Sequence, residues 1–143
     1  MSRVQLALNV ADLDASIDFY TKLFGTPPAK IRDGYANFVI TDPPLKLVLF
    51  SGGGEPGTLN HIGVEVDSTE DVTAAINPAN GLGFEQNIQE HVSCCYAVQD
   101  KTWIQGPDNA WEFYTLLAEA SSIDDSGRCA PVVDGANPAS SCC

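Results

Sequence analysis

The order of local patterns begins again near the middle of the chain, and this repeat restricts the fold more than any other feature. Residues 4–10 and 60–66 both alternate apolar and polar side chains, as half-buried strands do. Each is followed by a helix pattern, and Asp12 and Ser68 are placed to cap the two helices. In the second helix, Pro78 is expected to end the regular turns.

Strand patterns follow both helices. In the first half we predict strands at 29–32, 35–41 and 45–51, of which 29–32 has the weakest pattern. In the second half we predict strands at 95–99, 102–105 and 111–117. Each half therefore has the order β-α-β-β-β. We predict an α+β fold built from two βαβββ modules.

Composition sets the predicted domain boundaries. One domain over 1–117 comprises module one (1–51), a flexible glycine-rich linker (52–57) and module two (58–117). Residues 118–143 form a low-complexity, cysteine-containing tail that we expect to be disordered.

The charge balance excludes several classes of partner. Among 143 residues there are 7 Lys and Arg against 19 Asp and Glu, for a net charge of −12. Binding to nucleic acid or to an anionic membrane needs a basic patch, so neither partner is expected. No apolar run approaches the ~18 residues of a membrane span. The N-terminal sequence lacks a signal-peptide pattern, so we expect a cytoplasmic protein.

Three polar residues on predicted strands form a candidate metal site. Alignment of the first strands of the two halves places Gln5 opposite His61, and Glu112 lies among aromatic residues in a predicted central strand. Amide oxygen, imidazole nitrogen and carboxylate oxygen together suit Fe(II), and Mn, Co, Ni or Zn would also fit. The chain has only two histidines, His61 and His91, so a three-histidine site is excluded. A structural histidine, and a Glu112 that is solvated or paired with a lysine, are the alternatives.

Two adjacent cysteines form a second candidate site. Neighbouring Cα atoms lie ~3.8 Å apart, which is too close for an ordinary disulfide. Cys94 and Cys95 instead suit one soft ion such as As(III), Cd(II) or Zn(II). Joint ligation requires a turn or mobile loop around residues 90–101, because side chains alternate in a strand. The alternative is two buried apolar thiols. The tail holds three more thiols of open role, Cys129, Cys142 and Cys143.

Several stretches in combination resemble a known superfamily. Residues 4–20, 59–65 and 106–108 are similar to the vicinal oxygen chelate superfamily, also called glyoxalase/bleomycin resistance/dioxygenase, and the similarity covers residues 2–117. The adjacent cysteines and residues 99–101 narrow the resemblance. With them the chain resembles organoarsenical carbon–arsenic lyases, a group that also contains cadmium-induced proteins.

The resemblance implies a reaction and a set of site residues. Members are Fe(II)-dependent dioxygenases that detoxify trivalent organoarsenicals, such as methylarsonous acid and trivalent aromatic arsenicals, by cleaving the C–As bond and releasing arsenite. By position, Cys94 and Cys95 would bind As(III), while Gln5, His61 and Glu112 would hold the iron. The paired modules would form a cupped mixed sheet around the metal. The implied partners are the small-molecule organoarsenical and O2, and the implied assembly is a monomer or homodimer.

Two other functions are compatible with parts of the sequence. A non-catalytic Cd(II)- or As(III)-sequestering protein would use the thiols and would need neither Gln5 nor Glu112. A glyoxalase-like metalloenzyme commonly takes a fourth ligand from the last strand of module one, where this chain offers only Lys46 or Leu47. Four further residues are open as substrate contacts: Tyr96, Lys101, His91 and Tyr114.

Overall fold

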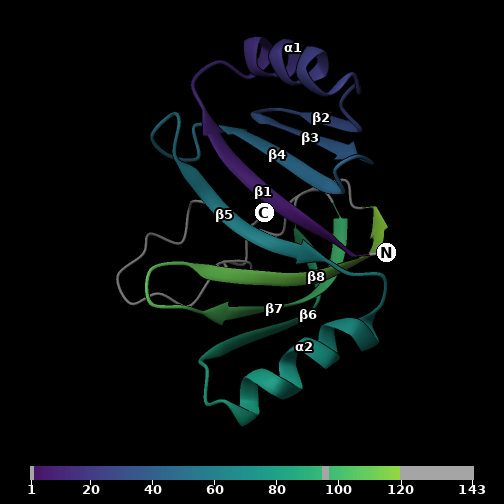
Figure 1. Cartoon of the computed structure of the whole chain (residues 1–143), viewed down its shortest axis with the longest axis vertical. Coiled ribbons are helices and arrows are strands. Elements are labelled where there is room, and N and C mark those ends of the chain that lie inside the picture. Colours follow the sequence, from purple (N-terminus) through teal and green to yellow (C-terminus); the bar gives the residue numbers. More distant parts are fainter. Residues whose placement is uncertain (1, 95–96, 120–143) are drawn as a thin grey trace. The chain divides into compact units, whose positions relative to one another are not determined.

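The structure is a computed structural model that describes residues 2–94 and 97–119 (Figure 1). The chain divides into two compact units. The first unit is Arg3–Ile62, and the second unit comprises Ser2 and the chain from Gly63 onward. The predicted β-α-β-β-β order occurs twice along the described chain, which confirms the repeat. Neither of the two helices in the described part combines the length and apolar content that a bilayer crossing demands.

The first unit is a mixed sheet covered by one helix. Its elements are β1 (Arg3–Val10), α1 (Leu13–Phe24), β2 (Lys30–Arg32), β3 (Tyr35–Ile40), β4 (Leu45–Ser51) and the first part of β5 (Leu59–Glu65). The strands follow the order β2-β3-β4-β1-β5. Strand β1 runs parallel to β4, whereas β3 is antiparallel to both β2 and β4. This pairing confirms the mixed sheet.

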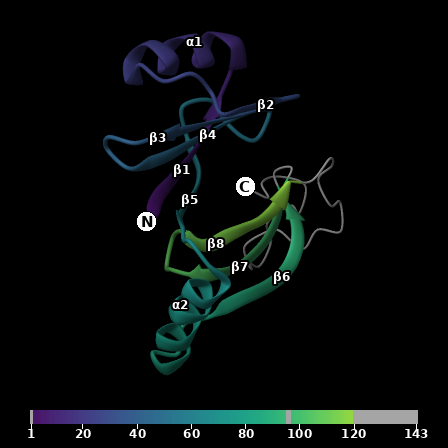
Figure 2. The same ribbon diagram turned by 90° about the vertical axis from the view of Figure 1, so that its right-hand side faces the viewer.

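Helix α1 begins and ends where the sequence predicts. The Asp12 side chain accepts a hydrogen bond from the Ala15 backbone N–H at 3.0 Å, and Gly25 ends the helix with a φ of 61°. Figure 2 shows α1 lying along one face of the sheet in the first unit. Its apolar side chains pack there on the hydrophobic core, whose fully buried members are Phe38, Ile40, Leu47 and Leu49.

The second unit repeats this arrangement. Its elements are the end of β5, α2 (Thr69–Gly81), β6 (Gln86–Cys94), β7 (Ala97–Gln105) and β8 (Ala110–Glu119). The strands follow the order β5-β8-β7-β6, with both β6–β7 and β7–β8 antiparallel. Helix α2 packs mainly on β7 and β8, and it lies beside these strands in Figure 2. Strand β8 thus has a neighbour on each side, as a central strand does.

One prediction about the second helix was wrong. Ser68 caps α2 as expected, accepting from the Asp71 N–H at 3.2 Å, but Pro78 lies inside the helix. The turn beyond Pro78 is retained because Ala79 is buried and its carbonyl accepts from the Phe84 N–H at 3.0 Å. Tertiary packing here outweighs the bond that a proline removes.

The strands around the adjacent cysteines also differ from the sequence prediction. Strand β6 was not predicted, and the two strands expected at 95–99 and 102–105 form one continuous strand, β7. Of the predicted turn or mobile loop over 90–101, the loop is wrong for the described residues, which are paired strands up to Cys94 and again from Ala97. The turn stays a prediction. The residues joining them, 95–96, lie outside the described residues, as does the tail from residue 120.

Candidate metal centre and its surroundings

Gln5 and His61 come together in the first unit, as the repeat predicts. They lie on β1 and β5, and their side chains are 3% and 6% exposed. Gln5 Nε2 is 3.0 Å from His61 Nε2. The other ring nitrogen, Nδ1, lies 2.8 Å from Asn60 Oδ1. Because Asn60 Oδ1 accepts at Nδ1, the neutral ring has its lone pair at Nε2, the atom that faces Gln5.

Glu112 is buried in the second unit, and its partner is a buried lysine. Glu112 is 1% exposed on β8, and Lys101 is fully buried on β7. Lys101 Nζ donates to Glu112 Oε1 at 2.8 Å and also lies 5.7 Å from the centre of the Trp103 ring. Two charges this deep persist only when they are paired. The lysine-paired alternative for Glu112 is therefore observed.

The backbone around Glu112 is packed without space for an extra atom. Gly63 of β5 lies so close to β8 that an added Cβ would be 2.7 Å from the Glu112 carbonyl oxygen. Nearby, the Tyr114 hydroxyl donates to Glu65 Oε2 at 3.0 Å, and both residues are buried. Tyr114 therefore holds a different carboxylate from Glu112. Tight packing and satisfied polar groups make this part of β8 a rigid support.

The cysteines are described only in part. The backbone of Cys94 is the last position of β6 and pairs with Ala97. Cys95 and Tyr96 lie outside the described residues, so the predicted thiol pair stays a prediction. Nearby on β6, His91 is at a bulge with a φ of 52° and has an exposed side chain. Its backbone N–H donates to Asp100 Oδ1 at 2.8 Å, which anchors the bulge.

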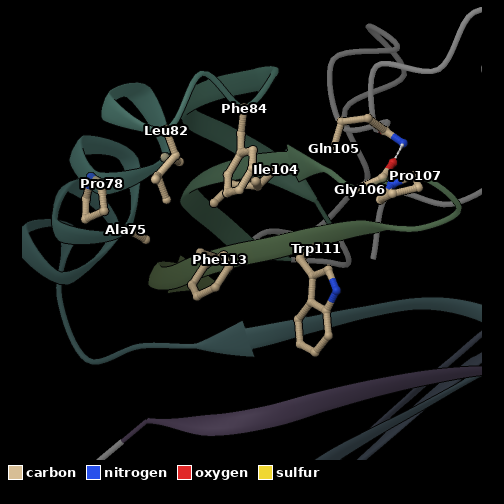
Figure 3. A pocket seen from close by; sticks show the side chains of 11 residues that line it. Ala75, Pro78, Leu82, Phe84, Ile104, Gln105, Gly106, Pro107, Trp111 and Phe113 are labelled. Carbon is tan, nitrogen blue, oxygen red and sulfur yellow. Dashed lines mark hydrogen bonds between the residues drawn. The ribbon is translucent and has the colours of Figure 1, made fainter.

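A pocket in the second unit lies on the side of the sheet away from Glu112. Trp111 and Phe113 flank Glu112 on β8, and alternation along a strand turns them to the opposite face. With α2 they line a cavity of about 620 Å³ (Figure 3). The lining is apolar apart from Gln105, whose amide donates to the Gly106 carbonyl at 2.7 Å. One amide in an otherwise apolar lining does not make a site for a metal or for arsenic.

The donor types fit a divalent metal. An imidazole nitrogen, a neutral amide and a carboxylate are each ligands that first-row metals accept. Among the described residues, no three His, Cys, Asp or Glu side chains cluster for a metal. Lys46 pairs with Gln5 across β1 and β4 and is buried. An ammonium is a poor ligand, which disfavours a glyoxalase-type fourth ligand there.

Comparison with known proteins decides the family. The model of the Glyoxalase/Bleomycin resistance protein/Dioxygenase superfamily matches residues 3–114. The chain belongs to this superfamily. Solved structures agree on the fold: the Mn(II)-bound glyoxalase of Novosphingobium aromaticivorans has a TM-score of 0.58 at 20% identity, over 89% of this chain and 45% of that one. A Y257F variant of homoprotocatechuate 2,3-dioxygenase from B. fuscum has a TM-score of 0.60 at 20% identity, over 82% and 32%.

Two superfamily relatives are much closer in sequence. The trivalent organoarsenical cleaving enzyme of Thermomonospora curvata is 52% identical over 136 residues, which are 92% of this chain and 90% of that protein. The cadmium-induced protein CadI of Mycobacterium bovis is 50% identical over 144 residues, covering 100% of this chain and 93% of that protein. These matches confirm the resemblance that the sequence suggested.

Sequence reasoning did not identify Lys101 as the lysine that pairs with Glu112, and it missed Asn60 beside His61. Lys101 carries no local signal of burial, because a lysine on a strand is ordinarily solvent-exposed. Only the antiparallel register of β7 and β8 brings it next to Glu112. Asn60 directly precedes His61 in the sequence, so its proximity could have been predicted. Its hydrogen bond to His61 Nδ1 depends on side-chain geometry, which the sequence does not show.

Proposed function

We propose that this protein is an enzyme that cleaves the carbon–arsenic bond of trivalent organoarsenicals and releases arsenite. The 52% identity to a trivalent organoarsenical cleaving enzyme, over nearly the whole of both chains, carries this proposal. A second relative with the same activity in its name, from Bacillus sp. strain MD1, is 34% identical over the full length of this chain. Methylarsonous acid and trivalent aromatic arsenicals are the proposed substrates.

The proposed metal ligands are Gln5, His61 and Glu112, with Fe(II) as the metal. The burial of Gln5 and His61 side by side supports the first two. With a metal bound, His61 would give it the Nε2 lone pair that now faces the Gln5 Nε2–H, and Gln5 would turn its amide oxygen to the metal. The buried carboxylate of Glu112, with Oε1 already held by Lys101, supports the third. When bound, the iron would supply the binding and activation of O2.

The proposed role of the thiols is to capture and orient the arsenic. Two thiols, from Cys94 and Cys95, would replace the two hydroxyl groups of an As(III) centre. Each As–OH bond would break as an As–S bond forms, and each hydroxyl group would leave as water with the proton of the thiol. Sulfur is the ligand type that soft ions prefer. Arsenic held by two sulfurs keeps a single organic substituent, so the pair would fix the direction of the C–As bond.

The overall reaction balances with O2 as the oxidant. For methylarsonous acid, CH3As(OH)2 and O2 give formaldehyde and As(OH)3. The C–As bond breaks, the methyl carbon is oxidised, O2 is reduced, and arsenic stays trivalent. Formaldehyde and arsenite are therefore expected in equal amounts.

Sequestration is the second candidate function. The 50% identity to a cadmium-induced protein favours it, as do five cysteines in a chain of −12 net charge. A sequestering protein would hold the soft ion at its thiols and would not require the buried Glu112 carboxylate.

A single-turnover assay tests the proposal. Metal-free protein is prepared under reducing, anaerobic conditions and given Fe(II) and methylarsonous acid; air is then admitted and the arsenic species are separated. Arsenite that forms only with both iron and O2 is the expected result. Arsenic that stays bound without arsenite, across Fe, Mn, Co and Ni, would favour sequestration instead. The variant Lys22→Met is the control, because this exposed lysine on α1 is neither a proposed ligand nor a possible substrate contact.

A further inference from the structure

A chain of hydrogen bonds in the first unit ends on the imidazole of His61. It starts at the backbone carbonyl of Glu55 and passes through the side chains of Thr58, Asn9 and Asn60. We call these three side chains the relay. Asn9 is 5% exposed, and His61 is buried at the end of the relay.

The direction of every hydrogen bond in the relay follows from its first acceptor. A carbonyl oxygen only accepts, so the Thr58 hydroxyl uses its proton on Glu55 O, at 2.5 Å. Thr58 Oγ1 must then accept from Asn9 Nδ2, at 2.9 Å. This orients the Asn9 amide with Oδ1 toward Asn60 Nδ2, again at 2.9 Å.

The same logic assigns the proton on His61. Once Asn60 donates through Nδ2, its Oδ1 is left facing His61 Nδ1 at 2.8 Å and accepts from it. The proton of the neutral ring therefore lies on Nδ1. The opposite ring nitrogen agrees: Gln5 Nε2, a donor, faces His61 Nε2 at 3.0 Å, so Nε2 accepts.

Two glycines pack closely against the side chains of the relay. A Cβ on Gly53 would lie 3.0 Å from Asn9 Oδ1 and 3.1 Å from Asn60 Nδ2. A Cβ on Gly54 would lie 2.7 Å from Asn9 Nδ2. Within the predicted linker, Gly53 and Gly54 thus pack against these amides, and a side chain at either position would displace them.

We propose that Asn60, oriented by Asn9 and Thr58, is a positioning residue that fixes His61 as the Nδ1–H tautomer and directs its Nε2 lone pair to the metal. The inference rests on the proposed role of His61 as a ligand. A hydrogen bond to the second nitrogen of a ligating histidine sets its tautomer and ring orientation, and losing it typically lowers metal affinity 10- to 100-fold.

The test reads the tautomer directly, without any metal. Protein labelled with ¹⁵N-histidine is studied by long-range ¹H–¹⁵N NMR at a pH well above ~6.5, the ordinary pKa of histidine. The chain has only two histidines, so His91→Gln assigns both sets of signals. We expect His61 to carry its proton on Nδ1 in the unaltered protein and in Asn60→Asp, which keeps an acceptor oxygen. Asn60→Ala should shift the ring toward the Nε2–H form.

The second readout is the affinity for Mn(II) alone, followed by electron paramagnetic resonance. We expect affinity to fall about 10- to 100-fold in Asn60→Ala and to recover largely in Asn60→Asp. Gly54→Ala should weaken Mn(II) binding by displacing Asn9. Gly81→Ala is its control, because a Cβ there meets nothing within 4 Å.

The outcomes separate the relay from the proposed function. A proton on Nε2 of His61 in the unaltered protein, or a tautomer unchanged in Asn60→Ala, would overturn the relay. The expected tautomers with no Mn(II) bound by the unaltered protein would instead overturn the metal role on which the proposal rests. The expected tautomers with equal Mn(II) affinity in all variants would overturn the positioning role of Asn60.

Discussion

Removing one charge of the buried ion pair in the second unit should destabilise the protein strongly, and more than removing one charge of an exposed pair. Lys101 is 0% exposed and Glu112 is 1% exposed, with 2.8 Å between Nζ and Oε1. Lys101→Met removes the charge and keeps a similar chain length against Trp103. Breaking a buried pair by removing one partner costs about 3–5 kcal/mol, because the other charge loses its compensation. We expect the free energy of unfolding of the metal-free protein to fall by that amount.

Urea denaturation of four proteins measures the effect and assigns it to the pair. Unaltered protein, Lys101→Met, Glu112→Gln and the double variant form a double-mutant cycle. Both single variants should be strongly destabilised, and the double variant should lose less than the sum, because neither charge is left alone. Lys22→Met is the control. Its partner Asp18 is 2.6 Å away, but the side chains are 73% and 64% exposed, so a loss of roughly 0.5 kcal/mol or less is expected.

Metal binding should change the stability of Lys101→Met in a way that tests the role of Glu112. If Glu112 is a ligand, a divalent ion replaces the positive charge that Lys101→Met removes. Saturating Mn(II) should then stabilise Lys101→Met more than it stabilises the unaltered protein. A loss below about 1 kcal/mol in metal-free Lys101→Met, or a double variant as unstable as the sum of the singles, would refute the reasoning.

Three further predictions follow from the site and the core. Glu112→Gln should stop arsenite formation in the single-turnover assay while arsenic is still retained on equilibrium dialysis; unchanged turnover would exclude Glu112 from the reaction. Cys94→Ser should lose methylarsonous acid binding and keep Mn(II) affinity, both measured by isothermal titration, whereas loss of the metal would contradict separate sites. Phe38→Ala removes a ring that is 0% exposed, and should cost about 3–5 kcal/mol in urea unfolding; a loss near zero would mean that this core is not well packed.

Local signals in the sequence predicted much of the fold. The caps of the two helices, Asp12 and Ser68, lie where they were expected because capping depends on residues within one turn. The repeat placed Gln5 opposite His61 because the two modules share one strand order. Strand β6 was not predicted because its side chains do not follow one continuous alternation of apolar and polar residues. A bulge at His91 shifts its register against β7.

The sequence by itself determined the two modules, the superfamily resemblance and the residues proposed as ligands, because these depend on local pattern and on residue type. Only the tertiary structure decided which groups surround those ligands. Lys101 and Glu112 meet through the register of β7 and β8. Asn60 contacts His61 directly, and the hydrogen bonds that begin at Glu55 orient the Asn60 amide. Hydrogen bonds and buried charges depend on distances of about 3 Å between side chains. Such distances are set by packing across strands, so sequence spacing does not reveal them.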